Sequence, residues 1–222
     1  MPTLGLVHNS PMLAGVFNEI AARVMPDVRI LHFVDESTIK NTIAAGHLQK
    51  STMRQVIRLV GSTFDAGCDV AMVTCSSIGR AVEMAAELYD RPVLRVDRAM
   101  AEQAVASATR IGVVATLSTT LDPTADLVRR VAAEQGKAIE LVPHLCEGAF
   151  DAVMAGDGAT HDRIVGEALT NALTNVDTIV LAQASMARVV ASLPEGAVKA
   201  PVLSSPELGM IRAAEVLKGL AK

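Results

Sequence analysis

The feature that most limits the fold of this chain is an internal repeat of apolar segments. Four segments of the first half recur in the same order in the second half, at a nearly constant offset of roughly 110 residues. A single match would be weak, because strands buried in parallel sheets are uniformly apolar. Four matches with a shared order and spacing indicate two similar halves. The matched pairs are 5–7 with 112–114, 28–36 with 139–147, 75–80 with 183–188, and 92–94 with 201–203.

Within each half, apolar and β-branched runs that are typical of strands alternate with segments whose apolar residues recur at helical spacing. This alternation predicts βαβ units and a mainly parallel sheet. We therefore predict an α/β fold of two similar halves, 1–97 with 205–222 and 98–204, each with a four-stranded sheet and related by a pseudo-twofold axis. Expected strands are 3–8, 28–34, 70–73, 92–96, 110–115, 138–142, 178–182 and 201–204; expected helices are 12–24, 48–66, 79–88, 98–108, 122–134, 161–174, 185–192 and 207–220, and 36–46 is predicted as loop with a short helix.

The composition excludes several classes of protein. Half of the 222 residues are hydrophobic, which supplies a substantial core. The net charge is −4, which argues against the basic footprint of a nucleic-acid-binding protein. No apolar run has the length of a membrane span and the first residues lack the basic region of a signal peptide, so we expect a cytoplasmic protein without membrane contact. Three cysteines make neither a disulfide framework nor a zinc set, and no spacing of His, Cys, Asp and Glu predicts a metal.

The turn around Cys75 is the strongest candidate for chemistry. It follows the apolar run 70–73 and precedes the helical pattern 81–86, so Cys75 is expected at the carboxyl end of a strand, where ligands bind in open α/β sheets. Ser76 and Ser77 can cap the helix, and its free N–H groups favour a carboxylate and a thiolate. We therefore expect the pKa of Cys75 to lie below the free value of about 8.5. The alternative is a buried structural cysteine, which is common among free cysteines.

Several serine and threonine residues follow the carboxyl ends of predicted strands. Their hydroxyl groups can cap the next helix by accepting hydrogen bonds from its free N–H groups. Where several helix N-termini converge, the same hydroxyl groups can also form a carboxylate site. If the two halves face each other across the pseudo-twofold axis, Cys75 faces Gln183, and the cleft between the halves is the predicted pocket. The residues expected to contact a substrate are Asn9, Ser10, Ser76, Ser77, Thr116, Thr119, Gln183, Ala184 and Ser185.

The histidines and the remaining cysteines leave two interpretations open. His8 and His32 end apolar strands and are either hydrogen-bonded core residues or functional groups; His8 is the better functional candidate because it adjoins the Asn9 turn. Cys68 precedes its strand, at the amino end, and is expected to be structural. Cys146, beside His144, is interpreted as a loop cysteine, with an approach to the cleft as the alternative.

Three segments together resemble the aspartate/glutamate racemase superfamily, which includes hydantoin racemases, maleate isomerases and arylmalonate decarboxylases. They are Thr74-Cys75-Ser76-Ser77, the strand and turn 111–116 with Thr119, and Ser204-Ser205-Pro206. The order of the elements fits over nearly the whole chain. The resemblance implies two α/β halves, no cofactor, and two thiols that flank a carbon next to a carboxylate. One thiol removes a proton and the other delivers one from the opposite face; Cys75 falls at the first thiol position.

The chain departs from this pattern at the second thiol. Gln183-Ala184 stands where a typical member has Cys followed by Thr or a similar small residue, and Gln cannot act as a base at neutral pH. The resemblance then implies a racemase or isomerase with one catalytic thiol, Cys75, acting on a small acid, amino acid or hydantoin, in a homo-oligomer. The alternatives are a single-thiol decarboxylase, a cis–trans isomerase of a small dicarboxylate, and a carboxylate-binding relative without turnover.

Overall fold

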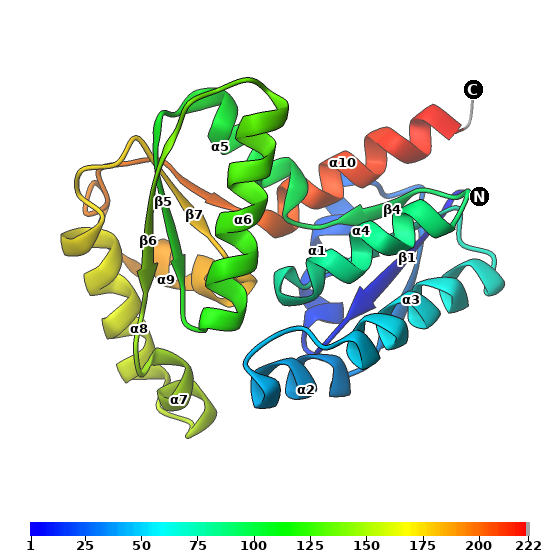
Figure 1. The fold of residues 1–222 in the computed structure, drawn as a ribbon, viewed down its shortest axis with the longest axis horizontal. Coiled ribbons are helices and arrows are strands. Elements are labelled where there is room, and N and C mark those ends of the chain that lie inside the picture. Colours follow the sequence, from blue (N-terminus) through cyan, green and yellow to red (C-terminus); the bar gives the residue numbers. More distant parts are fainter. Residues whose placement is uncertain (221–222) are drawn as a thin grey trace. The chain divides into compact units, whose positions relative to one another are not determined.

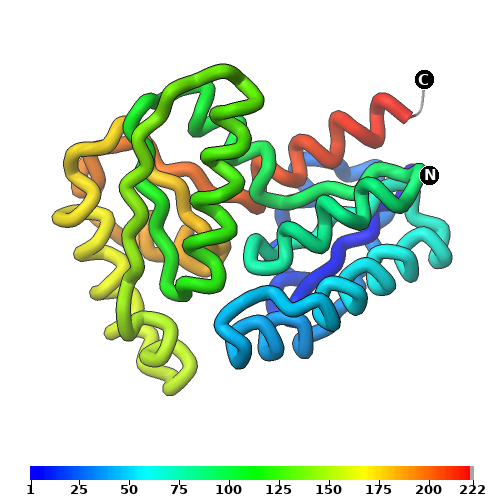
Figure 2. Tube along the Cα trace, in the orientation of Figure 1, coloured from blue at the N-terminus to red at the C-terminus, as the bar shows by residue number. Residues whose placement is uncertain are grey.

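The computed structural model describes residues 1–220, which form two compact units. The first unit contains Met1–Ala99 and the chain from Pro206 onward, and the second contains Met100–Ser205. The path is traced by colour in Figure 2, where the blue-to-green start and the red end belong to the first unit. Each unit is described separately below.

The first unit contains a parallel sheet of four strands in the order β2-β1-β3-β4. Figure 1 labels β1 and β4 of this sheet and the helices of the unit. The two central strands are fully buried, which explains why their sequences are apolar without alternation. Helices α1 and α10 pack on one face of the sheet, and α3 and α4 pack on the other. The elements are β1 (Thr3–His8), α1 (Leu13–Val24), β2 (Arg29–Val34), α2 (Ser37–Ala45), α3 (Lys50–Asp65), β3 (Val70–Val73), the 3-10 helix η1 (Ser76–Ile78), α4 (Gly79–Leu88), β4 (Val93–Arg95) and α10 (Ser205–Leu220).

The second unit repeats this arrangement with a parallel sheet in the order β6-β5-β7-β8. The predicted α/β fold with two four-stranded parallel sheets is therefore confirmed. The π-helical segment η2 continues α8 and packs with α9 against one face of this sheet. The elements are α5 (Arg98–Ser107), which crosses the unit boundary, β5 (Arg110–Ala115), α6 (Ser118–Glu134), β6 (Glu140–Leu145), α7 (Ala149–Met154), α8 (Gly158–Glu167), η2 (Ala168–Ala172), β7 (Thr178–Leu181), the 3-10 helix η3 (Ala184–Met186), α9 (Ala187–Ser192) and β8 (Val202–Ser204).

Several predicted boundaries in the second unit were wrong. Helix α6 begins at Ser118 and not at 122, with Pro123 inside its second turn. Strand β6 runs through Pro143 to Leu145, beyond the predicted end at 142. A proline is tolerated there because β6 is an edge strand. A proline whose nitrogen faces away from the sheet removes no hydrogen bond to the neighbouring strand. The short helix α7 was not predicted. In the first unit, the segment 36–46, predicted as loop with a short helix, forms the nine-residue helix α2.

Gly209 allows α10 to pack closely on the chain that follows β4. A Cβ atom at this position would lie 2.7 Å from the carbonyl oxygen of Val96 and 3.2 Å from its Cα, and backbone atoms cannot rotate away. We expect Gly209→Ala to lower the free energy of unfolding by about 1–3 kcal/mol, measured by urea denaturation. Gly219→Ala is the matched control, because Gly219 lies on the same helix and a methyl group there would meet no atom within 4 Å. That control should be neutral or stabilising by up to about 1 kcal/mol, and equal effects of the two changes would contradict this account.

No helix among residues 1–220 is long and apolar enough to cross a membrane.

Candidate active site

The Cys75 turn lies immediately beyond the buried strand β3. Cys75 has extended backbone angles (φ −134°, ψ 118°) and directly precedes the short helix η1, after which α4 begins at Gly79. The strand end and the helix start hold the thiol at the carboxyl edge of the sheet. The Cys75 side chain is partly exposed, whereas Ser76 and Ser77 are buried beneath it.

The thiol of Cys75 is surrounded by hydrogen-bond donors. The amide of Asn9, the residue that follows β1, donates to Cys75 Sγ over 2.9 Å. The backbone N–H groups of Ser77 and Ile78 and the hydroxyl of Ser77 also interact with it. The structure thus brings together Asn9, Cys75, Ser76 and Ser77 of the predicted site. These donors suit a sulfur that carries negative charge during part of a reaction.

The pKa of the Cys75 thiol is nevertheless raised above its ordinary value. Burial has the largest effect, because protein atoms displace most of the water that would solvate a thiolate. The donors at Ser77 and Ile78 oppose this effect without overcoming it, and the nearby carboxylate of Asp97 adds to it. The expectation of a lowered pKa was therefore wrong. The helix start was visible in the sequence, but the predicted capping by Ser76 and Ser77 was wrong, because the N-cap residues are Cys75 for η1 and Ile78 for α4. The depth of the site and the position of Asp97 were not visible in the sequence.

A chain of hydrogen bonds connects Thr74, beside the thiol, to the protein surface. His8 Nδ1 lies 2.8 Å from Thr74 Oγ1, and His8 Nε2 lies 2.9 Å from His32 Nδ1. His32 Nε2 lies 2.9 Å from Oδ1 of the exposed Asn18. The pKa of His8 is lowered to about 4, first by burial and second by His32, and burial also lowers the pKa of His32.

The hydrogen bonds from Thr74 to Asn18 can all form with both imidazole rings neutral if every donor points toward Asn18. The Thr74 hydroxyl donates to His8 Nδ1, His8 Nε2–H donates to His32 Nδ1, and His32 Nε2–H donates to Asn18. The alternative, in which the Thr74 hydroxyl donates to the Val7 carbonyl at 3.1 Å, would leave His32 doubly protonated to keep its contact with Asn18 Oδ1. The lowered pKa values favour the neutral chain. Because His8 Nε2 is bonded to His32, His8 is a structural neighbour of the thiol turn and presents no free ring nitrogen.

The second unit contains a contact in the corresponding place. Gln183 lies two residues beyond β7, as Cys75 lies two residues beyond β3, and it too directly precedes a short 3-10 helix. Its Oε1 accepts bonds from the backbone N–H (2.6 Å) and the hydroxyl (2.9 Å) of Thr116. Thr116 follows β5 as Asn9 follows β1. In each unit, the residue that directly follows one central strand thus contacts the residue two positions beyond the neighbouring central strand. These pairs are Asn9 with Cys75 and Thr116 with Gln183.

Thr119 lies in the first turn of α6, where helix N–H groups lack intrahelical partners. It is buried, and its hydroxyl has no hydrogen-bond partner among the described residues. Buried hydroxyl groups are normally paired, so an unpaired one beside free helix N–H groups is suited to a ligand with negatively charged oxygens.

The other sequence candidates are placed less distinctively. Ser10 is half-buried in the turn before α1, and Ala184 and Ser185 lie in η3, with Ser185 exposed. Cys68 and Cys146 are both buried, and burial raises the pKa of each thiol, that of Cys146 to about 11. Cys146 packs in the core of the second unit, which makes an approach to a ligand cleft the weaker interpretation. No group of three or more His, Cys, Asp or Glu residues among 1–220 is arranged to hold a metal ion.

Twin parallel sheets of identical order, each with a polar turn beyond its central strands, define the class of protein. The chain matches the Asp/Glu/Hydantoin racemase family over residues 9–213, and it belongs to that family. No curated protein matches the chain.

Similar folds occur among solved structures. An allantoin racemase from Klebsiella pneumoniae has a TM-score of 0.70 at 18% identity, over 100% of this chain and 89% of the other. A glutamate racemase from Francisella tularensis subsp. tularensis SCHU S4, in complex with D-glutamate, has a TM-score of 0.76 at 13% identity, over 99% and 82%. An aspartate racemase homologue from Pyrococcus horikoshii OT3 has a TM-score of 0.70 at 12% identity, over 98% and 100%. At these identities the likeness concerns the fold.

Proposed function

We propose that this protein is a cofactor-independent racemase or isomerase that acts at the carbon next to the carboxylate of a small acid or amino acid, or next to the ring carbonyl of a hydantoin. The observation that carries the proposal is the environment of Cys75. A partly exposed thiol at the carboxyl edge of the sheet accepts a hydrogen bond from Asn9 and faces the N–H groups that open η1. Family membership supports the reaction class.

In the proposed reaction, Cys75 exchanges a proton with the substrate carbon. The thiolate takes the proton from the carbon, and the substrate's own carboxyl group and the hydrogen-bond donors stabilise the resulting enolate-like charge. Return of the proton by the thiol gives exchange on the same face. Protonation by another donor on the opposite face gives inversion, after which the thiol releases its proton to water. The amide of Asn9 and the donors of Ser77 stabilise the thiolate while it carries the charge. The residues proposed to bind substrate are Asn9, Ser10, Ser76, Ser77, Thr116, Thr119, Gln183, Ala184 and Ser185.

Gln183 limits how the second proton is supplied. Its side chain does not titrate near neutral pH, and its carbonyl oxygen is already bonded to Thr116. A proton delivered from the other face of the carbon must therefore come from water or from a neighbouring group. This asymmetry predicts that exchange at the substrate carbon is faster on the face served by Cys75 than on the other.

A second candidate is a decarboxylase that protonates its product on one face. The raised pKa of Cys75 favours it, because the resting sulfur is then a protonated thiol ready to donate. Loss of CO2 from a malonate-like acid would leave the electron pair on carbon, Cys75 would transfer its proton to that carbon, and water would reprotonate the thiolate. The remaining alternatives are a cis–trans isomerase of a small dicarboxylate and a carboxylate-binding protein without turnover.

One screen separates these functions. The protein is incubated in D2O with small acids, amino acids and hydantoins, and each compound is followed by NMR for deuterium at the carbon next to the carboxylate. Exchange with retention of all carbons supports the racemase or isomerase, whereas loss of CO2 with one new C–D bond supports the decarboxylase. Binding without either change, across ligands that stabilise the fold, would contradict the enzymatic proposal.

Thr119→Val should separate ligand binding from folding. Removing a buried hydroxyl that has no partner should leave the free energy of unfolding unchanged or slightly higher. Loss of a hydrogen bond to a carboxylate should weaken ligand binding by about 10- to 100-fold, equivalent to about 1.5–3 kcal/mol. Both quantities are measured on one sample, by urea denaturation and by calorimetric titration with a hit from the screen.

Thr124→Val is a matched control, because the hydroxyl of Thr124 is bonded within α6 to the carbonyl of Thr120. It should leave ligand affinity unchanged. Unaltered affinity in Thr119→Val would remove this residue from the carboxylate site.

A further inference from the structure

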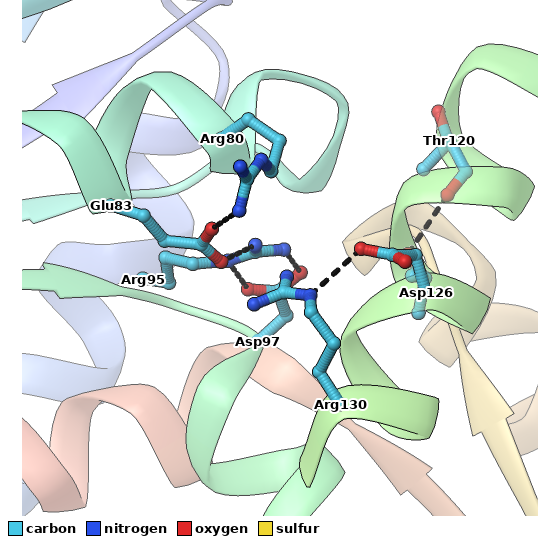
Figure 3. A network of polar contacts seen from close by, with 8 residues as sticks. Arg80, Glu83, Arg95, Asp97, Thr120, Asp126 and Arg130 are labelled. Atoms are coloured by element: carbon cyan, nitrogen blue, oxygen red, sulfur yellow. Dashed lines mark hydrogen bonds and ion pairs between the residues drawn. The ribbon is translucent and has the colours of Figure 1, made fainter. Parts of the chain in front are cut away.

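A buried ion pair lies directly behind the Cys75 turn and has no part in the proposed chemistry. Arg95 is the last residue of β4 and Asp97 follows two positions later; their side chains are 6% and 1% exposed. Arg95 Nε donates to Asp97 Oδ1 over 2.9 Å, and a terminal nitrogen donates to Oδ2 over 2.8 Å. Figure 3 shows this two-pronged contact, with Glu83 on the other side of the guanidinium.

The network is tied to the start of α4. Arg95 also bonds to Glu83 over 2.5 Å, and Glu83 bonds to Arg80 over 2.7 Å, so both of these residues of α4 are connected to β4. The guanidinium lies against Gly79, the first residue of α4, where a Cβ atom would collide with Arg95 Cζ. Glycine at this position is what permits the contact. Arg95 therefore holds the helix start that carries the donors around Cys75.

The carboxylate of Asp97 reaches the turn itself. Besides its two bonds from Arg95, it interacts with the hydroxyl of Ser76, the residue next to Cys75. Ser76 is buried and cannot exchange this bond for water. Because removal of two charges from water is costly, a buried ion pair is a poor explanation for stability alone. A carboxylate fixed on one side by Arg95 and bonded on the other to Ser76 is suited to holding a turn in one conformation.

We propose that Asp97 is a positioning residue for Cys75: clamped by Arg95, it holds the hydroxyl of Ser76 and so fixes the turn that directs the N–H groups of Ser77 and Ile78 toward the thiol. Its charge has a second effect. Arg95 and Ser76 hold the pKa of Asp97 below its usual range, so it stays ionised, and its charge disfavours the thiolate of Cys75. Asp97 thus aims the donors, and its charge adds to the larger effect of burial on the pKa of Cys75.

The first unit places charged and titratable groups of several elements near the turn. Asp97 and Arg95 lie at the end of β4, Glu83 and Arg80 lie on α4, and His8 lies at the end of β1, bonded to Thr74. Among the acidic groups, Asp97 acts on the charge state of Cys75, whereas Glu83 bonds to the outer side of the same Arg95. This difference provides a matched pair of substitutions with the same change in charge.

The test measures the rate at which iodoacetamide alkylates Cys75 as a function of pH, with each cysteine quantified by peptide mass spectrometry. Asp97→Asn removes the charge and keeps the shape, and the apparent pKa of Cys75 should fall by about one unit or more. Alkylation below that pKa should become about tenfold faster. Glu83→Gln is the control, and its alkylation profile should match that of the unaltered protein.

Ser76→Ala tests the hydroxyl link without altering the ion pair, and it decides the question if Asp97→Asn does not fold. A turn released from Asp97 aims its donors less well, so the apparent pKa of Cys75 should rise, opposite to the effect of Asp97→Asn. A profile unchanged in both Asp97→Asn and Ser76→Ala would overturn the proposal, and so would equal shifts in Asp97→Asn and Glu83→Gln. If Asp97→Asn does not fold, an unchanged Ser76→Ala profile overturns it alone.

The relevance of this positioning to catalysis rests on the proposed function, but the alkylation test needs no substrate. If no compound in the D2O screen reacts while the two variants shift the profile in opposite directions, the positioning role stands and the enzymatic proposal fails. The converse result is turnover of a substrate together with an unaltered alkylation profile in both variants. It would support the enzymatic proposal and contradict the positioning role of Asp97.

Discussion

Replacing Cys75 by serine should lower the rate of substrate-carbon exchange by about 10³-fold or more, while the fold and ligand binding persist. The change replaces one atom in a partly exposed side chain, so little packing is lost. A serine hydroxyl can still accept the hydrogen bond from Asn9, but it is a far weaker acid and base than a thiol near neutral pH. Because a positioned acid–base group contributes about 10² to 10⁴ in rate, most of the catalysis should disappear.

The measurement is deuterium wash-in to a compound identified by the D2O screen, with circular dichroism and ligand titration as checks on fold and binding. Cys68→Ser and Cys146→Ser are the internal controls, because Cys68 is buried before the amino end of β3 and Cys146 packs in the core of the second unit. The folded fraction of each control variant should retain the exchange rate of the unaltered protein. Full activity in Cys75→Ser would make Cys75 a packing residue and would contradict the thiol mechanism.

The sequence predicted the two parallel sheets because the signal is strong where strands are central. Strands β1, β3, β5 and β7 are apolar over most of their length and almost entirely buried, as expected for strands covered on both faces. Prediction failed at the sheet edge and in the second half of the chain. Pro143 obscured the end of β6, and the polar start of α6 hid a helix whose first turn carries Thr119.

The candidate site was predicted in part, for a related reason. Cys75 and its flanking serines follow a strand in sequence, so local pattern was sufficient to identify them. Asp97 was missed because its effect depends on a contact between the ends of β3 and β4, far apart in the chain. The available signal was an Arg and an Asp two positions apart at the end of an apolar strand, which is unusual unless the two are paired. Burial is the main cause of the raised pKa of Cys75 and that carboxylate adds to it, and neither effect can be read from the turn alone.

The buried histidine His8 should make the stability of the fold depend on pH above the range in which carboxylates titrate. Its pKa is lowered to about 4 in the folded protein, from an ordinary value of 6.5. The folded state therefore binds fewer protons than the unfolded state between these two values, and stability rises with pH across that window. The full effect is about 3 kcal/mol, present above pH 6.5 and lost as the pH falls toward 4. His32, whose pKa is also lowered, contributes with the same sign.

Urea denaturation at intervals between pH 4.5 and 7.5 measures this dependence. The lower limit avoids Asp35 and Asp97, whose lowered pKa values remove stability only as the pH falls through the ordinary range of aspartate. His8→Gln removes the titrating ring, so the rise in unfolding free energy between pH 4.5 and 6.5 should become much smaller, whatever the variant loses at neutral pH. His47→Gln, at an exposed position after α2, should retain the full rise. A rise that survives unchanged in His8→Gln would show that His8 binds its proton equally in the folded and unfolded states, and the lowered pKa of His8, with its support for the neutral hydrogen-bond chain, would have to be abandoned.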